Sequence, residues 1–285
     1  MAKIGTVSKT KEILQTNDFH IKKKFGQNFL TDQNILYNIV EVAHVDSQTL
    51  VIEIGPGIGS LSELLLEKAG HVLAYEIDPD LTPILQNQFA DKEFTLIEDD
   101  FLNRDVDSDI QHLTRTFQRI IVVANLPYYI TTPIVMKLLE ESKIIKEYYV
   151  MMQLEVAQRF TSKPSTKDYN SLSVFIQFKT TSSIAFKIPR SVFIPAPNVD
   201  SAIVKMVIKD QFERFPINEQ LFYSLVRKSF SMRRKTLVNN LNDMLQIDKE
   251  SFKEILESLG FSPSVRAEKL TVDDFITLAD YFDKN

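Results

Sequence analysis

The sequence predicts an α/β protein in which a parallel sheet is followed by a small helical domain. Two observations lead to this prediction. Short apolar runs alternate with segments of helical periodicity between residues 49 and 153, as in repeated βαβ units. From about residue 217 onward every signal is helical. A long strand-free stretch after an α/β region indicates a separate domain.

Five apolar runs are predicted as strands of one sheet. They cover residues 49–55, 71–78, 94–98, 119–124 and 147–153. Helical periodicity fills three of the intervals, at residues 60–68, 79–89 and 132–142. Pro79 would stand in the first turn of the second of these helices, where proline is tolerated, and Pro83 is still near the start of that helix. This alternation is what a parallel sheet with crossover helices requires.

The pattern changes after residue 154. A helix at 154–160 leads into a polar loop, and residues 171–188 and 201–208 are predicted as further strands. Four helical segments then begin near residues 218, 236, 249 and 271. We therefore expect a basic N-terminal extension at 1–24, a ligand-binding α/β domain at 25–210 and a helical C-terminal domain at 211–285.

Composition narrows the class of protein. The 285 residues are 44% hydrophobic and 25% charged, which is typical of a packed globular chain. The absence of cysteine excludes disulfides, thiolate nucleophiles and cysteine zinc sites, and the four scattered histidines indicate no metal site. No apolar run approaches the roughly 18 residues of a membrane span, and the first residues lack an apolar signal core. We expect a cytoplasmic, monomeric protein.

Glycine marks a candidate ligand site. The chain has only seven glycines, and three of them, Gly55, Gly57 and Gly59, stand at the end of the first strand. Missing side chains let the backbone approach a ligand, and the helix that follows favours a phosphate or a carboxylate. The spacing G-x-G-x-G departs from G-x-G-x-x-G, so a tight turn without a ligand is the alternative.

Acidic residues follow the second and third strands, at the same edge if the sheet is parallel. Glu76 lies 21 residues after Gly55, and an acid at that spacing can accept hydrogen bonds from both ribose hydroxyls of a nucleoside cofactor. Asp99 or Asp100 can accept a hydrogen bond from an adenine amine. The alternatives are a solvated strand-end acid and a helix N-cap.

The segment Asn125-Leu126-Pro127-Tyr128 follows the fourth strand. The N6 amine of adenine is a poor nucleophile, so a site that alkylates it needs acceptors for the amine hydrogens. The Asn125 side chain and the Leu126 carbonyl can supply them, and Tyr128 can stack on the base. Phe193 is a candidate second wall for a flipped base. The alternatives are a turn with a core tyrosine and a core phenylalanine.

Charge is unevenly distributed along the chain. The net charge of −5 argues against nonspecific nucleic-acid binding by the whole molecule, and residues 76–110 are strongly acidic. Basic residues gather in two short segments, which indicate either RNA contacts or solvated faces. The candidate RNA contacts are Lys22, Lys23, Lys24, Arg227, Arg233, Arg234 and Lys235.

Taken together, these motifs resemble those of the S-adenosylmethionine-dependent rRNA adenine N6-dimethyltransferases, and most closely those of the bacterial small-subunit (16S) branch. The resemblance covers nearly the whole chain. Beyond the motifs above, residues 25–30 are similar to the family's opening motif and 193–201 to its base-stacking loop. Residues 230–241 and 266–270 resemble the C-terminal domain of the small-subunit branch.

The resemblance implies a Rossmann-like, seven-stranded class I methyltransferase sheet with an antiparallel last hairpin. It implies S-adenosyl-L-methionine as cofactor and dimethylation of two adjacent adenosines in a hairpin loop near the 3′ end of 16S rRNA, within an immature 30S subunit. It adds Asn28 and Leu30 to the cofactor contacts. Carried over in full, these contacts are Asn28, Leu30, Gly55, Gly57, Glu76, Asp100 and Asn125.

Three alternatives stay open at this point. One is the related 23S rRNA adenine methyltransferase that confers macrolide resistance. Another is an RNA-binding ribosome assembly factor in which catalysis is secondary. The last is a nicotinamide dehydrogenase, which would leave the segment 125–128 and both basic segments unexplained.

Overall fold

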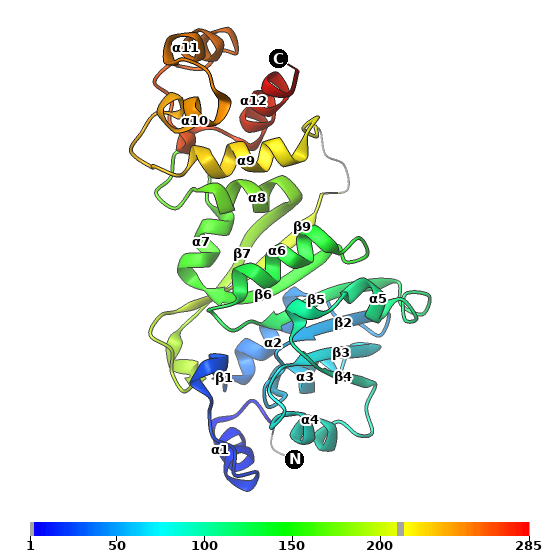
Figure 1. Cartoon of the computed structure of the whole chain (residues 1–285). Helices are drawn as coiled ribbons and strands as arrows, with labels where there is room; N and C mark the ends of the chain where they lie inside the picture. The colour runs from blue at the N-terminus through cyan, green and yellow to red at the C-terminus, as the bar shows by residue number, and fades with distance from the viewer. Residues whose placement is uncertain (1–2, 210–213, 285) are drawn as a thin grey trace. The chain divides into compact units, whose positions relative to one another are not determined.

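The computed structural model describes residues 3–209 and 214–284, without the side chain of Lys23 (Figure 1). The chain divides into two compact units. The first comprises Met1–Ala157 and Ser183–Val207, and the second comprises Gln158–Ser182 and Ile208–Asn285. The expected boundary at residues 210 and 211 lies outside the described residues. The second unit also includes residues 158–182, which the sequence-based division placed in the α/β domain.

A seven-stranded mixed sheet forms the centre of the first unit. In spatial order it contains β4 (Phe94–Glu98), β3 (His71–Glu76), β2 (Thr49–Ile54), β5 (Arg119–Asn125), β6 (Glu147–Gln153), β9 (Ser201–Ile208) and β7 (Thr180–Ile188). The first five strands are parallel, and β9 is antiparallel to β6. All six residues of β2 are buried, as expected for a central strand covered on both faces. The predicted methyltransferase-type sheet is confirmed.

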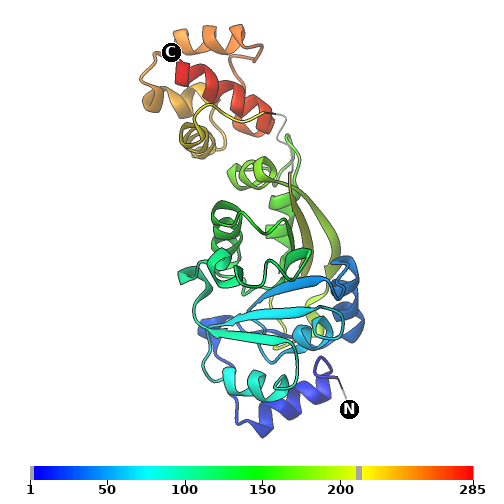
Figure 2. The same cartoon turned by 90° about the vertical axis from the view of Figure 1, so that its right-hand side faces the viewer.

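Helices cover both faces of this sheet. Helices α2 (Gln33–Val42) and α3 (Ser60–Leu65) pack their apolar residues against one face, and Figure 2 shows α6 (Thr131–Glu141) on the other. The prediction for α4 (Thr82–Gln88) is confirmed for Pro83, which stands in its first turn, and is wrong for Pro79, which does not. Pro79 lies in the preceding turn. Helices α2 and α5 (Val106–Ile110) were not predicted.

The N-terminal segment is packed against the first unit and does not extend from it. Helix α1 (Val7–Thr16) begins at the N-cap Thr6, and Ile4, Ile13 and Phe19 are buried in a cluster with apolar residues of the α4 region. A short strand, β1 (Phe29–Leu30), pairs antiparallel with β8 (Phe193–Ile194). Residues on either side of α1 are therefore parts of the core that surrounds the glycine loop.

The second unit is helical. Helix α7 (Leu154–Thr161) enters it, and it contains α8 (Ser171–Lys179), α9 (Glu219–Ser229), α10 (Leu237–Leu245), α11 (Lys249–Ser258) and α12 (Val272–Lys284). The last four confirm the predicted C-terminal helices. Buried aromatic rings fill its interior, with the rings of Phe178 and Phe222 4.7 Å apart.

Residues 171–179 correct a prediction. They were expected to begin a strand, but they form α8, and only Thr180–Ile188 is extended. Asn170 supplies the start signal, because its side chain accepts from the Leu172 and Ser173 amides while Ser173 Oγ accepts from the Asn170 amide. The apolar residues of this short helix are buried almost all round, so no helical periodicity shows in the sequence.

Candidate active site at the carboxyl edge of the sheet

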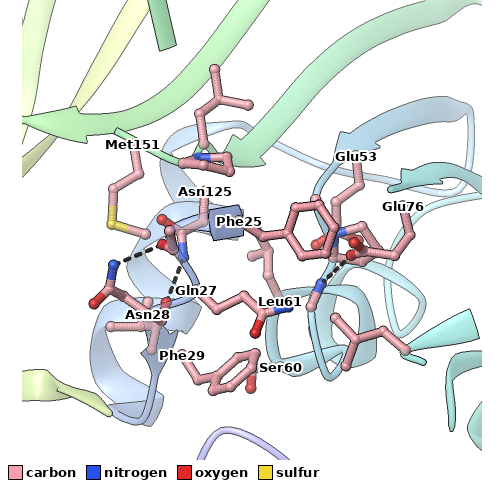
Figure 3. A pocket seen from close by; sticks show the side chains of 18 of the residues that line it. Phe25, Gln27, Asn28, Phe29, Glu53, Ser60, Leu61, Glu76, Asn125 and Met151 are labelled. Atoms are coloured by element: carbon pink, nitrogen blue, oxygen red, sulfur yellow. Dashed lines mark hydrogen bonds between the residues drawn. The ribbon is translucent and has the colours of Figure 1, made fainter. Parts of the chain in front are cut away.

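A pocket that is partly open to solvent lies at the carboxyl ends of the central parallel strands (Figure 3). Most of its walls come from three segments that are distant in sequence: residues 25–30, the loop after β2, and residues 125–128 after β5. This is the edge at which open parallel sheets bind ligands. It brings together most of the predicted catalytic and cofactor-binding residues, namely Asn28, Leu30, Gly55, Gly57, Glu76, Asn125, Leu126 and Tyr128.

The loop after β2 is shaped for close approach of a ligand. Gly57 has a φ of +63°, and a Cβ at this position would lie 3.1 Å from the ring of Phe29. A side chain would therefore be strained there and would also crowd the pocket wall. Ser60 lines the same pocket, and its hydroxyl is buried without a hydrogen-bond partner among the described residues. The loop thus presents bare backbone and an unsatisfied hydroxyl.

Glu76 is a buried carboxylate beside this loop. Its Oε2 accepts from the Gly57 amide at 3.1 Å, and its Oε1 accepts from the Asp78 amide at 2.9 Å. Burial raises the pKa of Glu76 to about 7, although both amide hydrogen bonds oppose the shift. Figure 3 shows the side chain at one end of the pocket. A carboxylate held in this way can accept further hydrogen bonds from ligand hydroxyls.

Glu53 is a second buried acid, which the sequence analysis gave no role. It lines the pocket, and the hydroxyl of Ser62 donates to its Oε2 at 2.6 Å. Burial raises the pKa of Glu53 to about 8, with a contribution from the charge of Glu76. Burial and the nearby charge of Glu76 both favour the neutral form of Glu53, which reduces repulsion between acids at two adjacent strand ends.

Asn125 stands at the other end of the pocket. Its Nδ2 donates to the main-chain oxygen of Asn28 at 3.4 Å, which leaves Oδ1 as the acceptor that a ligand can use. Tyr128 is held by a 2.6 Å hydrogen bond between its hydroxyl and that of the buried Ser201. The amide and the aromatic ring are thus positioned before any substrate arrives.

A family model described as ribosomal RNA adenine dimethylase matches residues 18–284. The chain belongs to the ribosomal RNA adenine dimethylase family. With this family, the predicted enzyme class and the predicted cofactor, S-adenosylmethionine, are confirmed.

Two curated relatives align with this chain over almost their full lengths. The ribosomal RNA small subunit methyltransferase A of Lactococcus lactis is 48% identical over 280 residues, which is 98% of this chain and 95% of the relative. The protein of the same name from Streptococcus pneumoniae is 47% identical over 282 residues, covering 98% of this chain and 97% of its own.

Solved structures share the fold of this dimethylase. A dimethyladenosine transferase from Plasmodium falciparum superimposes with a TM-score of 0.73 at 26% identity, covering 90% of this chain and 97% of its own. The 23S rRNA methyltransferase ErmE superimposes with a TM-score of 0.68 at 24% identity, covering 89% of this chain and 99% of its own. At that identity, ErmE supports the fold alone.

The residues of this dimethylase fit S-adenosylmethionine as a ligand. The cofactor joins a ribose, whose hydroxyls need an acceptor, to an amino-acid tail, whose carboxylate needs donors. The pocket offers the buried carboxylate of Glu76 for the ribose hydroxyls and the unsatisfied Ser60 hydroxyl beside the glycine loop for the carboxylate of the tail.

No helix in the described ranges is long and apolar enough to cross a bilayer.

Phe193 is not brought to the pocket. It is only 3% exposed, and in β8 it pairs with Leu30 within the apolar core. Two other aromatic residues, for which the sequence predicted no role, lie in the pocket wall or next to it. Phe25 lines the pocket. Tyr129 is 58% exposed, and its ring lies against Gly26: a Cβ added to Gly26 would be 3.2 Å from that ring. The position of Tyr129 directly after the 125–128 segment was a usable signal.

Asp99 and Asp100 differ in their partners. Asp99 accepts from Arg104 at 3.5 Å, whereas Asp100 caps the turn Phe101–Asn103 by accepting from the Leu102 amide. Burial, and then the charges of Asp100 and Glu76, raise the pKa of Tyr129. Neither aspartate lines the pocket itself.

The predicted RNA contacts fall into two groups. Lys22 is turned inward and forms ion pairs with Asp78 and Asp80, whereas Lys24 is exposed above the ring of Phe25. The side chain of Lys23 is outside the described part of the chain. At the end of α9 and in the turn before α10, the exposed cationic residues are Arg227, Lys228, Arg233, Arg234 and Lys235, which we call the basic surface.

Proposed function

We propose that this dimethylase transfers methyl groups from S-adenosylmethionine to the N6 atoms of two adjacent adenosines in small-subunit rRNA. The observation that carries the proposal is the convergence of Asn125–Tyr128, Glu76 and the glycine loop on one pocket. The names of the L. lactis and S. pneumoniae relatives support the small subunit as the source of the substrate.

In this proposal the cofactor lies along the strand ends. Glu76 accepts from its ribose hydroxyls, because a buried carboxylate already held by two amides gains most from further donors. Gly55 and Gly57 admit the ligand to the backbone. Asp100, and not Asp99, accepts from the adenine amine. This choice is supported by the ion pair that Asp99 already forms with Arg104 and that Asp100 does not share. Asn28, Leu30 and Asn125 complete the contacts.

The bound cofactor supplies an electrophilic methyl group on a sulfonium ion. The protein orients the nucleophile: Asn125 Oδ1 and the Leu126 carbonyl accept the two hydrogens of the adenine amine and aim its lone pair. Tyr128 stacks on the flipped base, with Phe193 proposed as the second wall. Phe193 would have to leave its buried position to fill that role. The rate enhancement comes from positioning and electrostatics. No general base is needed close to the amine, because the amine becomes acidic once it carries the methyl group and then loses its proton.

The substrate is a hairpin loop near the 3′ end of 16S rRNA within an immature 30S subunit. The basic surface supports this proposal because its five exposed cations can contact phosphates while the rest of the acidic chain avoids nonspecific binding. The enzyme acts as a cytoplasmic monomer.

The test is mass mapping of adenosines after incubation of unmethylated 30S and 50S precursors with the enzyme and isotopically labelled S-adenosylmethionine. We expect two adjacent N6,N6-dimethyladenosines in the 30S sample and none in the 50S sample. Label in the 50S sample alone would instead establish the 23S activity. Normal subunit assembly with an Asn125→Ala variant would argue against a role that depends on catalysis.

A further inference from the structure

One wall of the pocket is made by a segment that contains little regular structure. Residues 18–30, which we call the strap, contain only the turn Lys23–Phe25 and the two residues of β1. Phe25 to Leu30 nevertheless line the pocket. A segment with so few internal hydrogen bonds needs an external anchor to keep a defined position beside a ligand.

Buried apolar residues and the pairing of β1 with β8 hold part of the strap, and its polar anchor is the side chain of Asp78, which is fully buried. Its Oδ1 accepts from Lys22 Nζ at 2.5 Å, and its Oδ2 accepts from Gln27 Nε2 at 2.7 Å. Gln27 Oε1 in turn accepts from the Lys22 amide at 2.8 Å. The three residues thus form a closed ring of hydrogen bonds between the strap and the turn after β3.

The same turn also holds the proposed ribose acceptor. The amide of Asp78 donates to Glu76 Oε1, so one residue fastens the strap with its side chain and orients Glu76 with its backbone. The charge of Lys22 is committed to this turn, because its ammonium also lies 2.5 Å from Asp80 Oδ2. The ammonium also lies near two rings of the strap, with Nζ 6.0 Å from the centroid of Phe19 and 5.8 Å from that of Phe25.

We infer that Lys22, Gln27 and Asp78 form a clasp that positions the strap and Glu76 for cofactor binding, so that Lys22 is a positioning residue for the cofactor and not an RNA contact. If the strap must be seated for the pocket to be complete, seating and cofactor binding stabilise each other. Removal of the Lys22 charge leaves the buried carboxylate of Asp78 without its cation, which favours release of the strap.

The central experiment replaces Lys22 by methionine, which keeps the length of the side chain and removes its charge. We expect the Kd for S-adenosylmethionine, measured by calorimetry on the full chain, to rise about tenfold. The KM for S-adenosylmethionine should rise in step, whereas the KM for 30S subunits should stay unchanged. Lys11→Met is the matched control, because Lys11 is exposed on α1, and it should change neither constant.

Two further variants separate positioning from general loss of structure. Lys22→Arg should retain most of the cofactor affinity, because a guanidinium can also pair with Asp78 and Asp80. In a Lys22→Met background, Asp78→Asn should recover part of the loss, because the buried charge has been removed with its partner. Hydrogen exchange of strap amides should slow when cofactor binds, and slow less in Lys22→Met.

Opposite results would overturn the inference. If Lys22→Met leaves the cofactor Kd unchanged, the clasp has no positioning role. If the same variant raises only the KM for 30S subunits and weakens its salt dependence, Lys22 contacts RNA. If Lys22→Met does not fold, the double variant Lys22→Met, Asp78→Asn is compared with the unmodified enzyme. An equal Kd for S-adenosylmethionine in these two proteins would also exclude the clasp.

Discussion

The pocket of the first unit and the basic surface of the second use polar residues in opposite ways. In the pocket, Glu53 and Glu76 are buried, hydrogen-bonded and shifted in pKa. On the basic surface all five cations are exposed, and none forms an ion pair within the described ranges. Buried groups concentrate binding energy in a few positions, whereas exposed charges distribute it. Single substitutions should therefore have large effects in the pocket and small, salt-dependent effects on the surface.

The largest effect is expected at Asn125. Asn125→Ala removes an acceptor that is positioned by Asn28 before substrate arrives, so kcat should fall by roughly 10²–10³-fold. Cofactor affinity should change little, because the glycine loop and Glu76 remain. Single-turnover methylation of 30S subunits, together with calorimetry of cofactor binding, checks both parts. Near-normal turnover would remove Asn125 from the catalytic residues.

Glu76→Ala should act on binding. Loss of a buried carboxylate that accepts ligand hydroxyls should weaken S-adenosylmethionine binding by about 10–100-fold. Glu76→Gln keeps one acceptor oxygen and should give an intermediate Kd. Calorimetry on the three proteins at one pH orders them, and equal affinities would show that the ribose is held elsewhere.

The raised pKa of Glu76 predicts a pH dependence of cofactor binding. With a pKa of about 7 in the free enzyme, Glu76 is increasingly protonated as the pH falls below 7, and a neutral carboxyl is a poorer acceptor. Affinity should therefore rise between about pH 6 and pH 8 and then level off. The Glu76→Gln variant should lose this dependence. A flat profile in the unmodified enzyme would indicate that its free carboxyl is already ionised at pH 6.

The smallest effects are expected on the basic surface. Arg234→Ala or Lys235→Ala should each weaken rRNA binding only about two- to threefold at moderate salt. Each should also reduce the slope of log affinity against log salt by about one, because one phosphate contact is lost. Binding titrations at several salt concentrations measure the slope, and cofactor affinity serves as the internal control. An unchanged slope would mean that the substituted cation does not contact phosphate.

The strand ends were predictable for a clear physical reason. Runs such as residues 49–55 and 119–124 are mostly apolar, which predicts central strands, and a parallel arrangement brings their carboxyl ends to one edge. The same reasoning failed for residues 171–179. A helix that is buried almost all round has no polar face, and its apolar residues then resemble a buried strand.

The direction of a side chain was not predictable in the same way. Lys22 stands in a row of three lysines, and a row of like charges normally indicates a solvated or nucleic-acid-binding face. The three lysines in sequence do not reveal that the first of them, Lys22, donates to the carboxylate of Asp78, 56 positions further along the chain. Phe193 was equally ambiguous, because a phenylalanine before a proline-rich loop suits both a base-stacking wall and a core.

The pairing of β1 with β8 has a consequence for synthesis of the chain. Thr31 donates to the main-chain oxygen of Val192, a partner 161 positions later. When the glycine loop and Glu76 have been synthesised, β8, the partner of β1 in the pocket wall, has not. Pairings between residues so far apart in sequence form late. The cofactor site should become complete only after most of the protein has left the ribosome that makes it.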